Sequence, residues 1–301
     1  MGTLVKVRVP GTTANCGPGF DSIGMACTIY NELELTLSGR ERLSIEVCGE
    51  GAGMIPCDEH NIALQAIQAV LTRVGTKERG IVLRMENTIP LARGLGSSAA
   101  AIVAGLVAAN VATGNQLSRE EIFNMATQIE GHPDNVAPAL YGGITLSVVE
   151  GKNAHCLNFT PPAELKLVVA IPAFGLSTQV ARQVLPDAVS LEDAVFNISR
   201  AALLIGALTQ GKLDFLQYAL PDRIHQPYRE KLIPGMAAVF QSAIQAGALG
   251  AAISGAGPCL VAFTRQNCDT IGEAMVAAFE KHEVVSRYIV MDIDLRGAVV
   301  I

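Results

Sequence analysis

The amino-acid sequence predicts an α+β protein built from two domains. Strand-like and helix-like segments occur in unequal runs along the 301 residues, an order typical of α+β folds and not of a doubly wound sheet. Half of the residues are hydrophobic and 17% are charged, so the chain can bury a large core. Pro161-Pro162 lies near the middle of the chain and is the best candidate for a domain boundary. We therefore expect an N-terminal domain over residues 1–160 and a C-terminal domain over residues 161–301.

The first half of the chain begins with strand patterns. Apolar residues alternate with polar ones over residues 5–9, 33–37 and 43–47. This alternation predicts half-buried antiparallel strands, because strands in a parallel sheet are usually apolar throughout. Residues 61–74 have apolar side chains at helical spacing and are followed by a glycine, so they predict a helix. A further strand is expected over residues 81–86.

Two more helices are expected before the middle of the chain. The uncharged segment 97–112 predicts a helix that is buried on all sides. Ser118 and Glu121 form a capping box for a second helix that ends near Glu130, and a strand follows over residues 144–149. In the second half, the same patterns predict strands over 167–171, 251–253, 260–263 and 287–293, and helices over 192–209, 213–220, 235–246 and 269–282.

Charge and composition exclude several classes of function. The net charge of −6, the lack of a Lys/Arg cluster and the absence of Trp argue against a nucleic-acid partner. No apolar run reaches the roughly 18 residues of a membrane span, and the N-terminus lacks the apolar core of a signal peptide. The seven cysteines form no C-x-x-C pair, and the five histidines have no metal-ligand spacing. We therefore expect a cytoplasmic protein with no membrane or nucleic-acid partner.

Residues 90–101 contain the most informative motif of the chain. Gly94 and Gly96 allow a tight turn that brings backbone N–H groups close to a ligand. The hydroxyls of Ser97 and Ser98 follow, and then an expected helix. Free N–H groups and the helix dipole both favour negative charge at a helix N-terminus. The turn therefore predicts a phosphate-binding site, most simply for a nucleotide.

Two other phosphate-binding devices share part of this pattern. A Walker-type loop needs a lysine before its last hydroxyl residue, and the absence of lysine between residues 78 and 151 excludes it. The dinucleotide fingerprint G-x-G-x-x-A matches Gly94, Gly96 and Ala99. However, that fingerprint needs a strand directly before the first glycine and another strand after the helix, and this chain has neither. A plain glycine turn before a buried helix remains as the other interpretation.

Two further segments carry candidate polar groups. Residues 9–24 are glycine-rich and are expected to form a long loop after the first strand, with Asn15 and Asp21 among its polar side chains. Such a loop can also be a simple wide turn. Glu130 lies at the end of an expected helix, where the helix dipole disfavours an acid. A solvent-facing glutamate is the ordinary alternative.

The second half contributes two arginines and another glycine turn. Arg182 and Arg229 carry planar guanidinium groups that suit a carboxylate, although most arginines are surface charges. Residues 253–259 form a glycine turn between two apolar strands, which can also be a strained hairpin.

In order along the chain, these segments resemble the motifs of one superfamily of small-molecule kinases. Residues 90–99 resemble the phosphate-binding motif of galactokinases, homoserine kinases, mevalonate kinases and phosphomevalonate kinases, the GHMP kinases. Residues 9–21 resemble the first motif of the homoserine kinases, whereas galactokinases and mevalonate kinases have a Gly-Glu-His type sequence there. Residues 253–259 resemble the third motif of the superfamily. The resemblance extends over nearly the whole chain.

The resemblance implies ATP and Mg²⁺ as cofactors. In this superfamily the second motif binds the ATP phosphates, and its serine and a glutamate hold the Mg²⁺ that bridges the β- and γ-phosphates. By position these residues are Ser98 and Glu130. The implied ATP-binding residues are Pro90, Leu91, Ala92, Arg93, Gly94, Leu95, Gly96, Ser97, Ser98, Ala99 and Ala100, with Asn61 on the adenine side.

The same resemblance implies the amino acid L-homoserine as substrate. In homoserine kinases an asparagine and an aspartate of the first motif contact the amino acid, and two arginines hold its carboxylate. The implied substrate-binding residues are Asn15, Asp21, His132, Thr178, Arg182 and Arg229. The implied residues of the third-motif loop are Ser254, Gly255 and Gly257.

One difference from the wider superfamily concerns the catalytic base. Mevalonate and galactose kinases have an aspartate where Asn135 falls, and homoserine kinases resemble this chain in having an asparagine. An amide cannot accept a proton at neutral pH, so Asn135 is expected to orient the substrate hydroxyl. Asp134 is adjacent, and a shift of one residue would restore a base. The expected catalytic residues are Glu130, Asn135 and Ser98.

The resemblance therefore implies ATP-dependent phosphorylation of L-homoserine to O-phospho-L-homoserine, a step of threonine biosynthesis. It also implies the two-domain GHMP kinase fold, with an N-terminal domain like domain 2 of ribosomal protein S5 and a ferredoxin-like C-terminal domain. A homodimer is common in the family. Two alternatives remain open: a kinase of the same superfamily for another small alcohol, and a non-catalytic relative that binds similar ligands.

Overall fold

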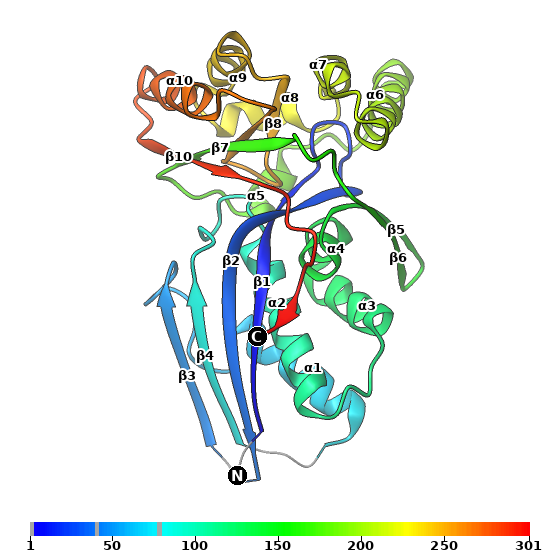
Figure 1. The fold of residues 1–301 in the computed structure, drawn as a ribbon, viewed down its shortest axis with the longest axis vertical. Coiled ribbons are helices and arrows are strands. Elements are labelled where there is room, and N and C mark those ends of the chain that lie inside the picture. Colours follow the sequence, from blue (N-terminus) through cyan, green and yellow to red (C-terminus); the bar gives the residue numbers. More distant parts are fainter. Residues whose placement is uncertain (1–2, 40–41, 77–79) are drawn as a thin grey trace.

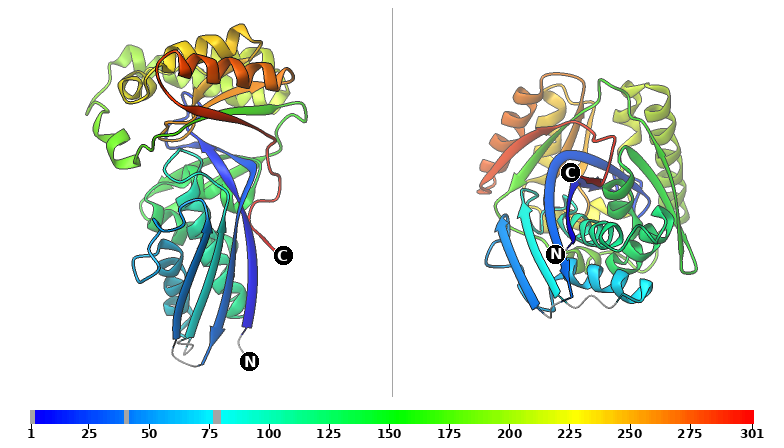
Figure 2. Two further views of the ribbon diagram at one scale, coloured as in Figure 1. Left: turned by 90° about the vertical axis from the view of Figure 1, so that its left-hand side faces the viewer. Right: turned by 60° about the horizontal axis from the view of Figure 1, so that its bottom comes forward.

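The computed structural model describes residues 3–39, 42–76 and 80–301, and its strands form two sheets (Figure 1). A seven-stranded sheet lies in the N-terminal part and a four-stranded sheet in the C-terminal part. Figure 2 shows the two parts stacked along the long axis of the molecule, so that the long strands of the first run toward the second.

The N-terminal sheet has the strand order β11-β1-β2-β4-β3, and the hairpin of β5 and β6 joins it along β2. Strands β1 and β2 are antiparallel and turn alternate apolar residues to the core, as the sequence pattern predicted. The strands are β1 (Thr3–Ala14), β2 (Ile23–Ser38), β3 (Arg42–Gly49), β4 (Gly80–Asn87), β5 (Ile144–Glu150), β6 (Asn153–Phe159) and β11 (Val299–Val300).

The expectation that the early strands are all antiparallel is wrong for β3. This strand pairs with β4 in parallel, from Arg42 opposite Gly80 to Gly49 opposite Asn87. Helix α1 (Ile62–Val74) connects the two strands, and a helical crossover of this kind brings the second strand back in the same direction. Apolar and polar residues alternate in β3 because this strand lies at the edge of the sheet, where part of its residues are exposed to solvent.

Half of the glycine-rich segment 9–24 is strand, so the expectation of one long loop over the whole segment is also wrong. Strand β1 continues to Ala14 and β2 begins at Ile23. Glycine, proline and threonine make this stretch look like a turn, but it continues the pairing with β2 beyond a bulge at Pro10–Gly11. The loop itself covers only residues 15–22, and Figure 1 shows it reaching into the C-terminal part.

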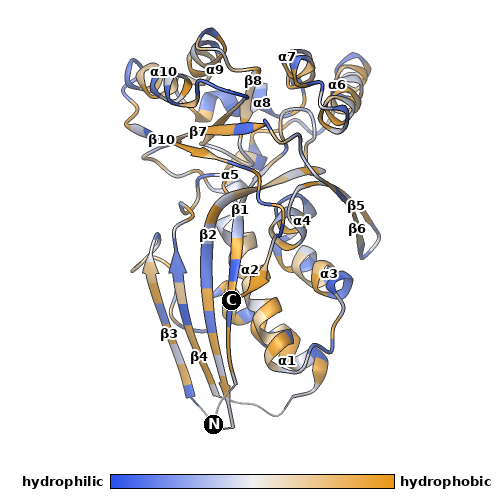
Figure 3. Ribbon diagram, viewed as in Figure 1, coloured by the Kyte–Doolittle hydropathy of each residue, from blue (hydrophilic) through white to orange (hydrophobic). Residues whose placement is uncertain are grey.

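Helices α1, α2 (Ser97–Ala112), α3 (Arg119–Glu130) and α4 (Pro133–Tyr141) pack on one face of the N-terminal sheet (Figure 1). Helix α2 is buried along most of its length, and the hydropathy colouring of Figure 3 shows no polar side on it. Helix α3 begins with the predicted capping box of Ser118 and Glu121. Helix α4 was not predicted, because Pro138 inside it interrupts the helical pattern.

The C-terminal sheet is antiparallel with the order β10-β7-β9-β8, and α9 and α10 pack on one face of it. The helix expected over residues 213–220 is divided into a 3₁₀ turn and α7, and α5 and α8 were not predicted. None of the described helices is long and apolar enough to cross a membrane. The strands are β7 (Lys166–Pro172), β8 (Gly250–Ile253), β9 (Leu260–Thr264) and β10 (Ser286–Met291); the helices are α5 (Thr178–Gln183), α6 (Leu191–Gln210), α7 (Leu216–Ala219), α8 (Gln226–Arg229), α9 (Met236–Gln245) and α10 (Cys268–Glu280), with 3₁₀ turns at Leu213–Phe215 and Glu230–Leu232.

The two parts of the molecule share a core. One hydrophobic cluster extends from the N-terminal sheet and its helices to Leu167, Val169 and Val261 on one face of the C-terminal sheet. A smaller cluster lies between the other face and helices α9 and α10. The end of the chain also returns to the N-terminal sheet, where β11 pairs with β1. The domain boundary after residue 160 therefore stays a prediction.

Candidate active site

The glycine turn at residues 94–96 lines a cavity of about 250 Å³. Gly94 and Gly96 have φ angles of +80° and +69°, a region that favours glycine. A Cβ atom on Gly94 would lie 2.1 Å from the Ser254 carbonyl oxygen, and one on Gly96 would lie 1.9 Å from Thr12 Oγ1. Only glycine fits at either position, so the tight turn depends on both residues.

Helix α2 begins directly after this turn. Gly96 is its N-cap and supplies no side-chain hydrogen bond to the first turn. Since the first N–H groups of a helix have no partner within it, those of residues 97–99 are open at the helix end. Ser97 and Ser98 line the cavity. The positive end of α2 therefore faces the cavity, which is the arrangement that binds phosphate.

Arg93 and Ser254 hold the turn against the C-terminal part. The Arg93 guanidinium donates to the carbonyl oxygens of Pro172 at 2.9 Å and Ala173 at 2.5 Å. Ser254 Oγ, in the third-motif loop, donates to the Gly94 carbonyl over 2.6 Å. The turn is thus fixed by bonds to two segments that lie far along the chain.

Ser98 and Glu130 place two oxygen atoms at the edge of the same cavity. Ser98 Oγ donates to Glu130 Oε2 over 2.8 Å. Burial raises the pKa of the Glu130 carboxyl, and the neighbouring His132 and the Ser98 bond only partly oppose this shift. The C-terminal end of α3 disfavours the same charge. A carboxylate and a hydroxyl beside a phosphate site are hard oxygen ligands of the kind that Mg²⁺ prefers, so the residues present fit this ion.

The start of helix α4 brings further polar groups together. His132 Nδ1 lies 2.6 Å from Asp134 Oδ1. Burial lowers the pKa of His132, but the hydrogen bond and charge of Asp134 outweigh it and raise the pKa. Asn135 lines the cavity and accepts a bond from Thr12 Oγ1 over 2.7 Å, whereas Asp134 is almost fully buried. Of the two neighbours, Asn135 is the one that faces the cavity.

Asp21, Arg182 and Arg229 meet around the ring of Phe20. Asp21 and Arg182 form a bidentate ion pair with N–O distances of 2.9 Å and 2.7 Å. The guanidinium carbons of Arg182 and Arg229 lie 5.5 Å and 5.3 Å from the Phe20 ring centroid. These residues come from the β1–β2 loop, α5 and α8. Only the tertiary fold gathers them into a site with both signs of charge.

Arg229 is 1% exposed and donates to the carbonyl oxygens of Ala181 and Gly255. Burial lowers its pKa to about 10. His225 Nε2 lies 2.8 Å from the Gly17 carbonyl oxygen, so this nitrogen must carry the proton. The other nitrogen, Nδ1, is then free to accept from Arg229 Nη1 at 3.3 Å. A neutral His225 thus helps to hold the buried cation.

Asn15 connects the first and third motifs. Its Nδ2 donates to the Gly255 carbonyl over 2.8 Å, and its Oδ1 accepts from the Asp21 N–H over 2.9 Å. Both ends of the amide therefore bond to the protein, and Asn15 positions Asp21. Gly255 also lines the phosphate cavity, as does Thr178 from the start of α5.

The other predicted ATP-binding residues lie in three environments. Residues 90–98 line the cavity, and Ala99 and Ala100 are buried in α2. Asn61 lines a second cavity, which shares Leu91, Ser97 and Ser98 with the first. Residues at the site that the sequence analysis missed are Thr12, Phe20, Leu176, Ser177, His225 and Ala256. Thr12, Phe20 and Ala256 stand within the recognised motifs, but nothing in the sequence marks the others.

Comparison with known proteins identifies the family. Residues 61–143 match the model of the GHMP kinases N terminal domain, and residues 204–281 match that of the GHMP kinases C terminal. The chain is 50% identical over 278 residues to the homoserine kinase of Moorella thermoacetica, covering 92% of this chain and 93% of that protein. It is 45% identical to the homoserine kinase of Carboxydothermus hydrogenoformans, covering 98% and 96%. The chain belongs to the homoserine kinase family of GHMP kinases.

The fold agrees with membership of the homoserine kinase family. The crystal structure of homoserine kinase from Cytophaga hutchinsonii, 33% identical, superposes with a TM-score of 0.91 and covers 99% of this chain and 97% of that one. The mevalonate kinase of L. major, 19% identical, has a TM-score of 0.73 over 96% of each chain and shows the shared fold alone. The expected two-domain α+β GHMP kinase fold is therefore confirmed.

Proposed function

We propose that this chain transfers the γ-phosphoryl group of ATP to the hydroxyl of L-homoserine, giving O-phospho-L-homoserine and ADP. One observation carries the proposal: Gly255 lines the phosphate cavity and also accepts a bond from Arg229, a member of the charged set around Phe20. A phosphate site and a site with charges of both signs are therefore adjacent. Homoserine, a zwitterion with a hydroxyl at the end of its side chain, fits that combination.

The backbone N–H groups at the start of α2 and the dipole of this helix would hold the phosphate groups of ATP. The open N–H groups at residues 97–99 and the turn at 94–96 face the cavity. Ser98 and Glu130 would hold Mg²⁺, which when bound neutralises the charge on the β- and γ-phosphates. Phosphoryl transfer depends mainly on such positioning and charge neutralisation.

The amino acid would bind by exchange of ion pairs. Without substrate, Asp21 and Arg182 neutralise each other. The homoserine ammonium would replace Arg182 on Asp21, and its carboxylate would take Arg182 together with Arg229. Asp21 and Arg182 would each keep an opposite charge throughout, and the buried Arg229 would gain one, so the cost of desolvation is limited.

In the transfer step the hydroxyl oxygen forms a bond to the γ-phosphorus while the bond to the ADP oxygen breaks. Asn135 cannot take up the hydroxyl proton, and it would orient the hydroxyl through its amide, which Thr12 holds. The proton would leave late, to an oxygen of the transferred phosphate. Catalysis without a side-chain base is consistent with the loose transition state of phosphoryl transfer.

An assay of ADP release tests the proposal. The purified chain with ATP and Mg²⁺ would be offered L-homoserine, other amino-acid alcohols and mevalonate. We expect turnover with L-homoserine. Turnover with mevalonate instead would favour another kinase of the superfamily, and no turnover with any alcohol would favour the non-catalytic relative. From its homoserine kinase relatives we further infer that the reaction serves threonine biosynthesis. From cysteine usage we infer that the protein lies in the cytoplasm; the homodimer stays a prediction.

A further inference from the structure

A second cavity of about 250 Å³ lies beyond the phosphate turn. It shares Leu91, Ser97 and Ser98 with the phosphate cavity, so a ligand on the turn can extend into it. Its other walls are mostly apolar, from Met54, Ile55, Pro56, Ile62, Met85 and Ala101. Three asparagines, Asn31, Asn61 and Asn87, also line it, together with His60. A flat apolar group with a polar edge would fit such walls.

The Asn31 amide has a fixed orientation and a free donor. Its Oδ1 accepts from the N–H groups of Thr88 at 2.9 Å and Ile89 at 3.0 Å. An N–H group can bond only to the oxygen of the amide, so Oδ1 and Nδ2 cannot be exchanged. Asn31 is 3% exposed, and its Nδ2 has no hydrogen-bond partner among the described residues. The cavity therefore has one buried donor that lacks an acceptor.

The Asn87 amide supplies the complementary group. Its Nδ2 donates to the Glu50 carbonyl over 3.3 Å, which fixes Oδ1 as the other end. Asn87 is 4% exposed, and its Oδ1 has no partner within the described part of the chain. Asn31 and Asn87 are direct neighbours in the antiparallel register of β2 and β4, so their Cβ atoms are about 5 Å apart on the same face.

Buried polar groups are normally paired, and leaving one unpaired is costly. Two unpaired groups of opposite type on neighbouring strands, both in one cavity, point to a ligand that satisfies them together. We propose that Asn31 and Asn87 select the base of the nucleotide: Asn87 Oδ1 accepts from the 6-amino group of adenine, and Asn31 Nδ2 donates to an adjacent ring nitrogen. Hypoxanthine and guanine carry an oxygen in place of the 6-amino group, so Asn87 Oδ1 would face another acceptor and both bases are disfavoured.

Asn61 lies in the same cavity but has no free amide group for this task. Its Oδ1 accepts from the N–H groups of Ala63 and Leu64 as the N-cap of α1, and its Nδ2 donates to the Pro56 carbonyl over 2.8 Å. Asn61 therefore shapes the cavity, and its expected place on the adenine side stays a prediction. The inference rests on the proposed function in one respect, that the phosphates of the nucleotide lie on residues 94–98.

Binding of nucleoside diphosphates to the unaltered protein tests the inference first. Calorimetry would compare ADP with purine riboside 5′-diphosphate, which lacks the amino group, and with inosine 5′-diphosphate. We expect purine riboside diphosphate to bind about tenfold more weakly than ADP, because Asn87 Oδ1 then stays unpaired. Inosine diphosphate should bind more weakly still. The 1-deaza and 7-deaza analogues of ADP identify the ring nitrogen, since only one of them should lose about tenfold.

Substitutions then test whether the preference for ADP depends on the side chains of Asn31 and Asn87. N87L removes the acceptor, so ADP and purine riboside diphosphate should bind within about twofold of each other. N31D keeps the oxygen that Thr88 and Ile89 require but replaces the donor, so ADP should bind about tenfold more weakly. N158L makes a matched exchange on exposed strand β6 and should bind ADP normally.

Equal binding of ADP and the purine riboside analogue to the unaltered protein would overturn the inference. A tenfold preference for ADP that persists in N87L would also overturn it. If N87L fails to fold, two measurements still test the inference. They are the binding of the ADP analogues to the unaltered protein and the binding of ADP to N31D. All binding is measured without homoserine, so a chain that binds ADP selectively but does not phosphorylate homoserine would refute the proposed function and leave this inference standing.

Discussion

The proposed phosphate site and the proposed acceptor site, the charged set around Phe20, are built in opposite ways. The phosphate site uses one continuous segment, residues 90–98, whose backbone and helix end face the cavity. The acceptor site uses charged side chains from three separate segments, at Asp21, Arg182 and Arg229. The first depends on local conformation and the second on tertiary contacts. We therefore expect the phosphate site to be sensitive to added atoms and the acceptor site to be sensitive to lost charge.

The two sites also differ in their cost to the folded state. The open N–H groups of α2 cost little where water or an anion can reach them. Arg229 is the largest of the fully buried side chains in the described chain, and its pKa is lowered to about 10 by burial. A buried cation must keep its carbonyl and ring partners. The acceptor site therefore depends on Ala181, Gly255 and Phe20 as well as on the charges themselves.

The largest effect is expected for G96A. The new Cβ would lie 1.9 Å from Thr12 Oγ1 at a φ of +69°, so the turn must move. Because a shift of about 1 Å in the reacting groups can cost a hundredfold, we expect kcat to fall at least that much. Steady-state kinetics with ATP and homoserine measure it.

G114A is the matched control for G96A. Gly114 also has a positive φ, +93°, but nothing lies within 4 Å of its added Cβ. The strain of the backbone conformation should cost about 1 kcal/mol of stability, with kcat unchanged. If G114A lost as much activity as G96A, backbone strain and not the fit of the phosphate turn would explain both.

E130Q should lower the activity of the enzyme without lowering the stability of its fold. Losing the proposed carboxylate ligand of Mg²⁺ should lower kcat by about a hundredfold or more, whereas E120Q on the exposed part of α3 should leave it unchanged. Burial raises the pKa of Glu130 in the folded state. The folded protein therefore holds this proton at higher pH than the unfolded chain does, and charging Glu130 destabilises the fold as pH rises through the raised pKa.

Calorimetry without nucleotide checks the sign of that effect. At neutral pH, E130Q should melt at the same temperature as the unaltered protein or a higher one. The difference should disappear as pH falls below the ordinary glutamate value of 4.5, where both proteins are uncharged at this position. A variant that melts lower at pH 7 would mean that Glu130 stabilises the fold, and its loss of activity could not then be assigned to the metal site.

R229A should affect the acceptor and not the nucleotide. Loss of a charge-assisted contact to the carboxylate should raise the KM for homoserine roughly thirtyfold, while the KM for ATP changes little. R182A should have a smaller effect, because Arg182 is partly exposed and water can replace it. R265A, a surface ion-pair variant, serves as control. Equal changes in both KM values for R229A would place this arginine in the nucleotide site.

How far the sequence could predict the site follows from the same comparison. Residues 90–98 are continuous, so the glycines and hydroxyls of the turn could be recognised directly. The capping box at Ser118 was likewise local. Asn31 and Asn87 could not be recognised, because their pairing depends on the β2–β4 register and their free groups on bonds to distant backbone. His225 was missed for the same reason, since Gly17 and Arg229 define its role.

The fold errors have a related cause. The alternation in β3 is a property of an exposed edge strand, and it does not report whether the neighbouring strand is parallel. The stretch before Ala14 has glycine, proline and threonine, yet the antiparallel pairing with β2 keeps it extended. In both cases a tertiary contact decides the local structure. The α+β class could be predicted because it depends on the order of elements and not on their pairing.

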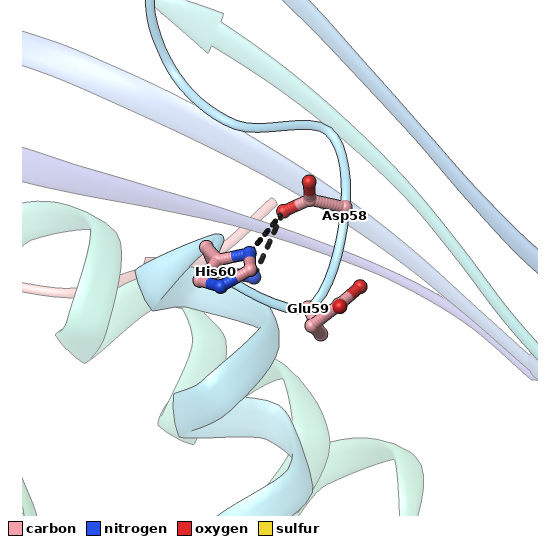
Figure 4. A group of neighbouring side chains, drawn as sticks. All are labelled: Asp58, Glu59 and His60. Carbon is pink, nitrogen blue, oxygen red and sulfur yellow. Dashed lines mark hydrogen bonds and ion pairs between the residues drawn. The ribbon is translucent and has the colours of Figure 1, made fainter.

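The smallest effect is expected at the other cluster of possible metal ligands. Asp58, Glu59 and His60 offer ligand atoms within 4.8 Å of one another on an exposed loop (Figure 4). Asp58 Oδ1 already accepts from the His60 N–H at 2.9 Å and lies 3.0 Å from its Nδ1. These bonds, chiefly the one from the backbone N–H of His60, lower the pKa of Asp58. Its carboxylate thus stabilises the turn before α1 without a cation.

D58N keeps the oxygen that His60 requires, so the turn should persist. We expect the Mg²⁺ concentration for half-maximal activity to change by less than about twofold, as for most surface substitutions. The same titration of E130Q should require much more Mg²⁺ for any activity that remains, because Glu130 would be a ligand beside the phosphates. A Mg²⁺ requirement that rises in D58N and not in E130Q would place the ion at the exposed loop. The pairing of Ser98 with Glu130 would then be a helix contact and no part of the phosphate site.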